Sequence, residues 1–158
     1  MTSNTPVTDA LKQVLADTYT LYLKTQNYHW NVTGPSFRSL HMLFEEQYND
    51  MFAANDEIAE RIRALGEKAP GGYSAFSKLT KISEGDNNKN AEAMLEDLYA
   101  SQQQMIATLK AGIDIAGDAN DNVTEDMLIG RLQVHEKQSW MLAASLPEET
   151  RSKLQKAA

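Results

Sequence analysis

Apolar residues recur at the spacing of an amphipathic helix over four long stretches of the chain, separated by segments that contain Gly or Pro. Each stretch ends at a helix-breaking signal, for example Gly34-Pro35 after the first and Pro147 after the fourth. Ser36 and Thr124 stand where a side-chain oxygen can cap the second and the fourth helix. The pattern predicts helices over residues 8–32, 37–65, 91–116 and 124–146.

The connection between the second and third helices is much longer than the other two. Residues 67–90 contain a Pro70-Gly71-Gly72 turn, one or two helical turns at 75–82 and a polar end. Up-and-down bundles have short loops throughout, whereas ferritin-like bundles have a long crossover. The sequence therefore predicts an all-α, ferritin-like four-helix bundle with a short extra helix in the crossover, followed by a short tail of mixed charge.

Length and composition exclude several classes of protein. The 158 residues suit one domain, here 1–158, that buries its own core. The absence of Cys excludes disulfides, thiolate metal sites and iron–sulfur clusters. No stretch is apolar enough to span a bilayer and Met1 to Leu11 do not read as a signal peptide, so we expect a cytoplasmic protein. The formal net charge of -7 opposes nucleic-acid binding and favours cations where acids cluster.

Candidate metal ligands gather on one face of the predicted helix 37–65. At about 100° per residue, His41, Glu45, Phe52, Asp56 and Glu60 fall on a band beside the apolar stripe. The pairs His41/Glu45 and Asp56/Glu60 are each four residues apart, so each pair can aim two side chains at one point. Imidazole and carboxylate without thiolate suit iron, manganese or zinc.

These two pairs are too far apart to bind one metal ion within one chain. Glu45 and Asp56 are separated by roughly 16 Å of helix, whereas metal–ligand bonds are about 2 Å long. Two copies of the helix, packed antiparallel about a two-fold axis near residues 50–51, would bring the first pair of one copy opposite the second pair of the other. His29 lies only a short turn before His41 and can join it. The spacing predicts two equivalent sites between subunits.

Other interpretations of the histidines stay open at the level of the sequence. An ordinary intrachain di-iron site takes a Glu-x-x-His motif from each of two helices. Here Gln, Arg and Leu stand three residues before the three histidines, which makes such a site improbable. His29 and His41 could instead be half-buried histidines beside a solvated acidic face. His135 lies amid leucines and is expected to be a satisfied core histidine rather than a ligand.

Two further groups of acids allow both a functional and a structural interpretation. Glu46, Asp50 and Glu57 lie on the far side of helix 37–65 and would line the cavity of a hollow assembly or simply face solvent. Asp121 and Asp126 stand at the start of the fourth helix. They would line an acidic entrance for iron, or cap the helix and offset its dipole.

The segment around the first two histidines carries a distinctive pattern. It runs His29-Trp30-Asn31-Val32-x-Gly34-x-x-Phe37-x-x-Leu40-His41-x-x-Phe44-Glu45 and continues through Tyr48 to Asp56-x-Ile58-Ala59-Glu60-Arg61. This pattern resembles the signature of the Dps family, the mini-ferritins. The likeness extends to the short helix in the crossover and to the stretch 117–128, so it covers essentially the full length.

The resemblance implies a hollow dodecamer with a ferroxidase centre at each two-fold interface, which couples Fe(II) oxidation to the consumption of hydrogen peroxide. The chain differs from the family at Glu45, where aspartate is usual. Trp30 resembles the tryptophan that the family has beside the centre. Matched one by one, the family's iron ligands fall on His29, His41, Glu45, Asp56 and Glu60.

Many members of the family bind DNA through a lysine-rich terminal extension, and here the chain differs as well. Residues 1–11 contain no Lys or Arg, and Glu148 and Glu149 offset part of the basic tail. We therefore expect a ferroxidase and iron-storage homo-oligomer with a di-iron centre and with weak or absent DNA binding. The alternatives are a nucleoid-associated, DNA-compacting protein and a helical interaction protein without metal chemistry. The basic residues of the tail are Arg151, Lys153 and Lys156.

Overall fold

The computed structural model describes residues 5–157, in which every regular element is a helix and no strand occurs. Four helices are long and two are short. In chain order they are α1 (Thr5–Asn31), α2 (Phe37–Ala64), α3 (Tyr73–Leu79), α4 (Ala91–Asp118), α5 (Asn122–Ala144) and α6 (Glu148–Ala157). None of the helices in this range is both long enough and apolar enough to cross a membrane.

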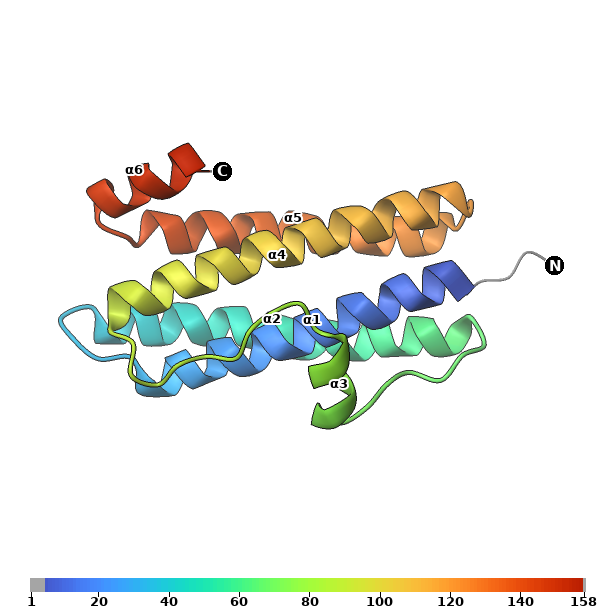
Figure 1. Cartoon of the computed structure of the whole chain (residues 1–158), viewed down its shortest axis with the longest axis horizontal. Coiled ribbons are helices and arrows are strands. Elements are labelled where there is room, and N and C mark those ends of the chain that lie inside the picture. Colours follow the sequence, from blue (N-terminus) through green and yellow to red (C-terminus); the bar gives the residue numbers. More distant parts are fainter. Residues whose placement is uncertain (1–4, 158) are drawn as a thin grey trace.

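The four long helices form two antiparallel pairs that pack into one bundle (Figure 1). α1 packs against α2 and α4, and α4 packs against α5. The crossover from the end of α2 to the start of α4 runs along the bundle, so that α2 and α4 point in the same direction (Figure 1). α3 lies in this crossover and packs against α1. The predicted ferritin-like bundle with a short helix in its long connection is confirmed.

Three features at the helix ends differ from the sequence-based expectation. Ser36 occupies the N-cap of α2, but its side chain makes no capping hydrogen bond. Thr124 is not the cap of α5, because Asp121 is: its carboxylate accepts hydrogen bonds from the backbone N (3.1 Å) and the hydroxyl (2.6 Å) of Thr124. The sequence pattern predicts no helix after Pro147, yet α6 forms there. None of the residues of α6 is buried, so it has no apolar stripe that would reveal it.

Two buried charged residues of α1 tie this helix to its neighbours. The fully buried carboxylate of Asp17 accepts hydrogen bonds from the Thr80 hydroxyl (2.9 Å) and the backbone N of Lys81 (2.7 Å) in the crossover. Lys24 Nζ lies 2.8 Å from the carboxylate of Asp97 on α4. Because buried polar groups are costly to leave unpaired, these contacts fix the crossover and α4 against α1.

Candidate metal centre

His29 and His41 meet at the end of the bundle where α1 turns into α2. His29 lies in the last turn of α1, and His41 lies in the second turn of α2. The connection turns at Gly34, whose φ of 112° falls in the left-handed region that favours glycine. The two imidazole rings stack, with centroids 3.7 Å apart and planes 14° from parallel. The structure therefore brings these two histidines together, as their spacing predicts.

Each of the two rings is held by the backbone of the other histidine. His29 Nδ1 lies 2.6 Å from the carbonyl oxygen of His41, and His41 Nδ1 lies 2.7 Å from the carbonyl oxygen of His29. A carbonyl oxygen only accepts hydrogen bonds, so each Nδ1 donates its proton. In the neutral form of each ring, the lone pair is then on Nε2. A ring oriented through Nδ1–H and open at Nε2 is the usual arrangement of a metal-binding histidine.

The carboxylates predicted as ligands do not reach this histidine pair in the same chain. Glu45 follows His41 by one turn of α2 and is exposed. Asp56 and Glu60 are exposed as well and lie roughly three and four turns beyond Glu45. Within residues 5–157, no three His, Asp or Glu side chains come close enough together to hold a metal ion. One chain thus presents an imidazole pair and, at a distance, a separate carboxylate pair.

Aromatic side chains border the histidine pair. The Tyr48 ring meets the His29 ring edge to face, with centroids 5.1 Å apart. Burial raises the pKa of the Tyr48 hydroxyl, and the negative charge of Glu45 raises it further. Trp30 is 64% exposed and does not belong to the core. In the sequence, Tyr48 stands out only as part of the signature, although its position two turns after His41 is a signal that places it beside the pair.

His135 lies in the core of the bundle and has no nitrogen free for a metal ion. Its side chain is fully buried, its Nδ1 donates to Gln102 Oε1 (2.7 Å) and its Nε2 accepts from Arg131 Nη2 (3.0 Å). Burial lowers the pKa of His135 to about 3, and the positive charge of Arg131 adds to the shift. The prediction of a satisfied core histidine is confirmed.

The sequence allowed two roles for several acids. In the structure some of these acids pair with arginines, and the others are exposed. Asp50 forms an ion pair with Arg131, with Oδ2 and Nη2 2.8 Å apart. Asp121 caps α5 and lies 2.8 Å from Arg61 Nη2. Burial alone would raise the pKa of Asp121, but hydrogen bonds from Thr124 and the charge of Arg61 outweigh burial and lower the pKa. Asp121 therefore has a structural role in the subunit. The acids left exposed are Glu46, Glu57 and Asp126.

The chain is similar to known proteins over nearly its whole length. Residues 8–151 match the family described as the ferritin-like domain. The DNA protection during starvation protein 2 of Bacillus anthracis is 38% identical over 143 residues, which are 90% of this chain and 98% of that protein. The crystal structure of Dps from Staphylococcus aureus is 38% identical, covers 89% of this chain and 95% of its own, and superposes with a TM-score of 0.86.

A third similar protein connects the fold with a kind of metal centre. It is the DPS protein from Vibrio cholerae O1, described as a member of a broad superfamily of ferritin-like diiron-carboxylate proteins. Its crystal structure is 29% identical, covers 90% of each chain and has a TM-score of 0.86. These similarities agree with the helix connectivity of the chain. The chain belongs to the Dps family of ferritin-like proteins.

Proposed function

We propose that this protein oxidises Fe(II) at sites formed between neighbouring subunits, preferentially with hydrogen peroxide, and stores the ferric product inside a hollow shell of twelve subunits. The observation that carries the proposal is the stacked pair His29/His41, which leaves both Nε2 atoms open. Within residues 5–157, the same chain does not complete the ligand set. A second copy supplies the missing carboxylates.

Two-fold symmetry provides this second half of the site. The midpoint between the two ligand pairs of α2 lies near residues 50–51. At that level of α2, Phe52 is 63% exposed, and Trp30 on α1 is 64% exposed, so apolar surface is available for an interface. An antiparallel pair of subunits would cover this surface and set each histidine pair opposite Asp56 and Glu60 of the other subunit.

Iron is the substrate in this proposal, and the ligand chemistry suits it. Imidazole nitrogen with carboxylate oxygen forms a borderline-hard site of the kind that binds iron. Two Fe(II) ions side by side can each give one electron to hydrogen peroxide, which is then reduced to water without release of hydroxyl radical. The reaction consumes Fe(II) and peroxide together, and this protects the cell against oxidative damage.

A mixing experiment tests the shared site. One variant carries His29→Ala and His41→Ala, the other carries Asp56→Asn and Glu60→Gln, and each alone should lose Fe(II) oxidation. After co-assembly in equal amounts, half of the subunit pairs are mixed and each mixed pair has one intact site, so about one quarter of the activity should return. Co-assembled shells without activity would contradict the shared site. As a control, each variant co-assembled with the unmodified protein should keep about half of the activity.

Storage needs a separate measurement, because oxidation alone does not require a hollow shell. Sedimentation velocity before and after addition of Fe(II) and hydrogen peroxide reports assembly and mineral loading in one experiment. We expect a large discrete particle that becomes denser after iron is added. A particle that oxidises iron but gains no mass would restrict the function to that of a ferroxidase.

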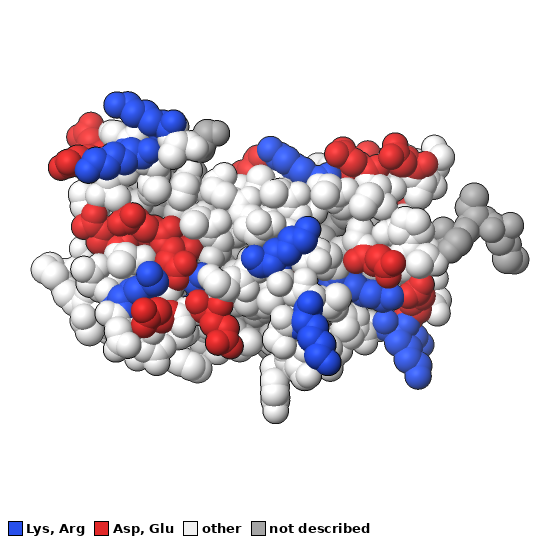
Figure 2. Space-filling model, in the orientation of Figure 1, with Lys and Arg blue, Asp and Glu red and all other residues white. Residues whose placement is uncertain are grey.

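Binding and compaction of DNA is the second candidate function, and the distribution of charge argues against it. Basic residues lie among acids on the face shown in Figure 2. On α6, Lys153 is 3.1 Å from Glu149 and Arg151 is 3.9 Å from Glu148. With a net charge of -7 per chain, little counterion release is available to drive binding. A salt-dependent gel shift at about pH 7 should show weak binding. Tight binding that survives neutralisation of Arg151, Lys153 and Lys156 would overturn this view.

A further inference from the structure

A row of aromatic rings leads away from the histidine pair, built from side chains of α1 and α2. The ring of Tyr48 lies 5.1 Å from that of His29, the ring of Tyr22 lies 5.9 Å from that of Tyr48, and the ring of Tyr19 lies 5.6 Å from that of Tyr22. His29 is buried and the three tyrosines are partly buried against the hydrophobic core. Helix packing therefore fixes the row as a continuous series of ring contacts.

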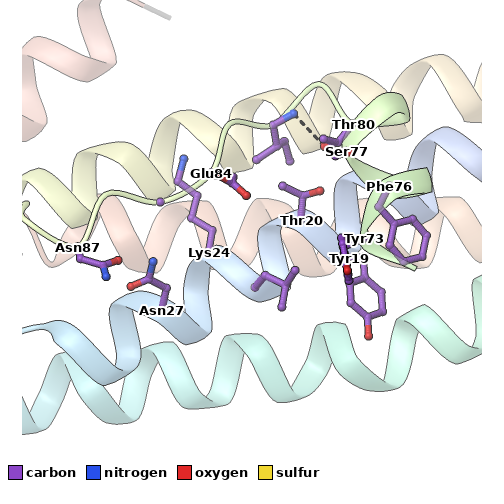
Figure 3. Close-up of a pocket in the computed structure, with 13 residues that line it drawn as sticks. Tyr19, Thr20, Lys24, Asn27, Tyr73, Phe76, Ser77, Thr80, Glu84 and Asn87 are labelled. Carbon is purple, nitrogen blue, oxygen red and sulfur yellow. Dashed lines mark hydrogen bonds between the residues drawn. The ribbon is translucent and has the colours of Figure 1, made fainter. Parts of the chain in front are cut away.

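The far end of the row lies at Tyr19. Its ring stacks on that of Phe76 in α3, with centroids 4.7 Å apart, at one end of the pocket of about 740 Å³ between α1 and the crossover (Figure 3). Tyr19 also lines a second hollow, together with Phe52 and Asp56. The ring of Phe52 lies 6.0 Å from that of Tyr22. The row thus begins at the histidine pair and ends at Tyr19, in a hollow that Asp56 also lines.

The two ends of the row belong to different metal centres under the proposed function. In an antiparallel pair of subunits, the histidine pair of a chain serves one shared site and Asp56 of the same chain serves the other. We propose that Tyr48, Tyr22 and Tyr19 form a relay that passes electrons between the two ferroxidase sites of a subunit pair. This inference rests on the proposed function, and it concerns sites that hold a single Fe(II).

The relay lets two half-filled sites complete one peroxide reduction. A single Fe(II) at the first site gives one electron to hydrogen peroxide, which forms Fe(III), hydroxide and a hydroxyl radical. The Tyr48 hydroxyl gives a hydrogen atom to this radical, which becomes water. Tyr22 then reduces the Tyr48 radical, and Tyr19 reduces the Tyr22 radical. In each step an electron passes between the rings, and the protons are exchanged with solvent. Fe(II) at the second site reduces the Tyr19 radical, which takes up a proton. In sum, two Fe(II), one peroxide and two protons give two Fe(III) and two waters.

The experiment uses assembled shells given less Fe(II) than they have sites, followed by hydrogen peroxide. Tyr22→Phe keeps the ring and its contacts but removes the hydroxyl in the middle of the row. Tyr99→Phe, on α4 and outside the row, is the matched control. Freeze-quench electron paramagnetic resonance detects tyrosyl radicals, a spin trap measures released hydroxyl radical, and peptide mass spectrometry locates oxidised residues.

The unmodified protein and Tyr99→Phe should show a short-lived tyrosyl radical, oxidation that reaches Tyr19 and little trapped hydroxyl radical. In Tyr22→Phe, oxidation at Tyr19 should be lost and the radical should persist at Tyr48. More hydroxyl radical should then be trapped in a second round of Fe(II) and peroxide, because Tyr48 is still oxidised. Fe(II) oxidation at saturating iron should be the same in all three proteins. Normal iron oxidation with no difference between Tyr22→Phe and the control would overturn the relay alone. Absence of iron oxidation in the unmodified protein would overturn the proposed function and the relay with it.

Discussion

The histidines at the turn between α1 and α2 and the histidine in the core of the bundle show opposite uses of the same side chain. His29 and His41 each use Nδ1 for a backbone carbonyl and leave Nε2 open. His135 uses both nitrogens, one for Gln102 and one for Arg131. Burial of a histidine is therefore a poor guide to its function, since His29 is nearly as buried as His135, at 6% and 0% exposed. The bonding of the second nitrogen separates a candidate ligand from a structural residue.

The largest expected effect is on the rate of Fe(II) oxidation, and it distinguishes the open histidine pair from the histidine in the core. His29→Ala removes a proposed ligand and should lower the initial rate of Fe(II) oxidation by more than about 10-fold, since even loss of a ligand's outer partner typically has such an effect. His135→Ala should leave the rate per assembled shell unchanged. It should instead lower the free energy of unfolding by about 3 kcal/mol, because it leaves a cavity and unpaired buried partners.

Stopped-flow absorbance with matched concentrations of assembled shells measures the rates, and denaturant titration measures the stability. Sedimentation of each variant controls for loss of assembly. If His29→Ala and His135→Ala lowered the rate of Fe(II) oxidation equally, the open Nε2 of His29 would not explain its role.

Stability at acid pH should depend on His135, and the effect is of intermediate size. The pKa of His135 is about 3 in the folded chain, against about 6.5 in the unfolded chain. As the pH falls through 6.5, the unfolded chain binds a proton that the folded chain does not bind until about pH 3, so acidification favours unfolding. Between pH 6.5 and pH 5, this residue should lower the free energy of unfolding by about 2 kcal/mol.

The test compares the unmodified protein with His135→Gln at pH 7 and pH 5 by urea titration. Other titrating groups affect both proteins alike, so the difference between the two pH responses isolates the histidine. Parallel loss of stability in both proteins would show that His135 is protonated, or its site rearranged, well above pH 3.

The smallest expected effect concerns the acids at the start of α5. Asp121→Ala removes the N-cap and the ion pair with Arg61, and should lower the free energy of unfolding by about 1 to 2 kcal/mol. Asp126→Ala changes an exposed side chain and should alter stability by less than about 0.5 kcal/mol. If Asp126 lines an entrance for iron, its removal should instead slow Fe(II) uptake at low ionic strength. Unchanged uptake would leave Asp126 without a role in iron entry.

The sequence by itself determined the four long helices, their connectivity and the separation of the two ligand pairs. Apolar periodicity and helix-ending residues such as Pro147 are local signals, and the rise of a helix fixes how far Glu45 lies from Asp56. Local signals are weaker where side-chain oxygens compete for a cap. Asp121 rather than Thr124 caps α5 because Arg61, sixty residues earlier in the chain, holds the carboxylate in place.

Tertiary packing alone decided the properties that distinguish the candidate site. The reciprocal bonds between His29 and His41 depend on the angle at which α2 returns along α1, and residue spacing does not encode that angle. The contacts of Tyr48 with His29 and with Tyr22 likewise join residues of different helices. Periodicity reports which side of a helix is apolar, whereas the partner that a side chain meets depends on how the helices pack.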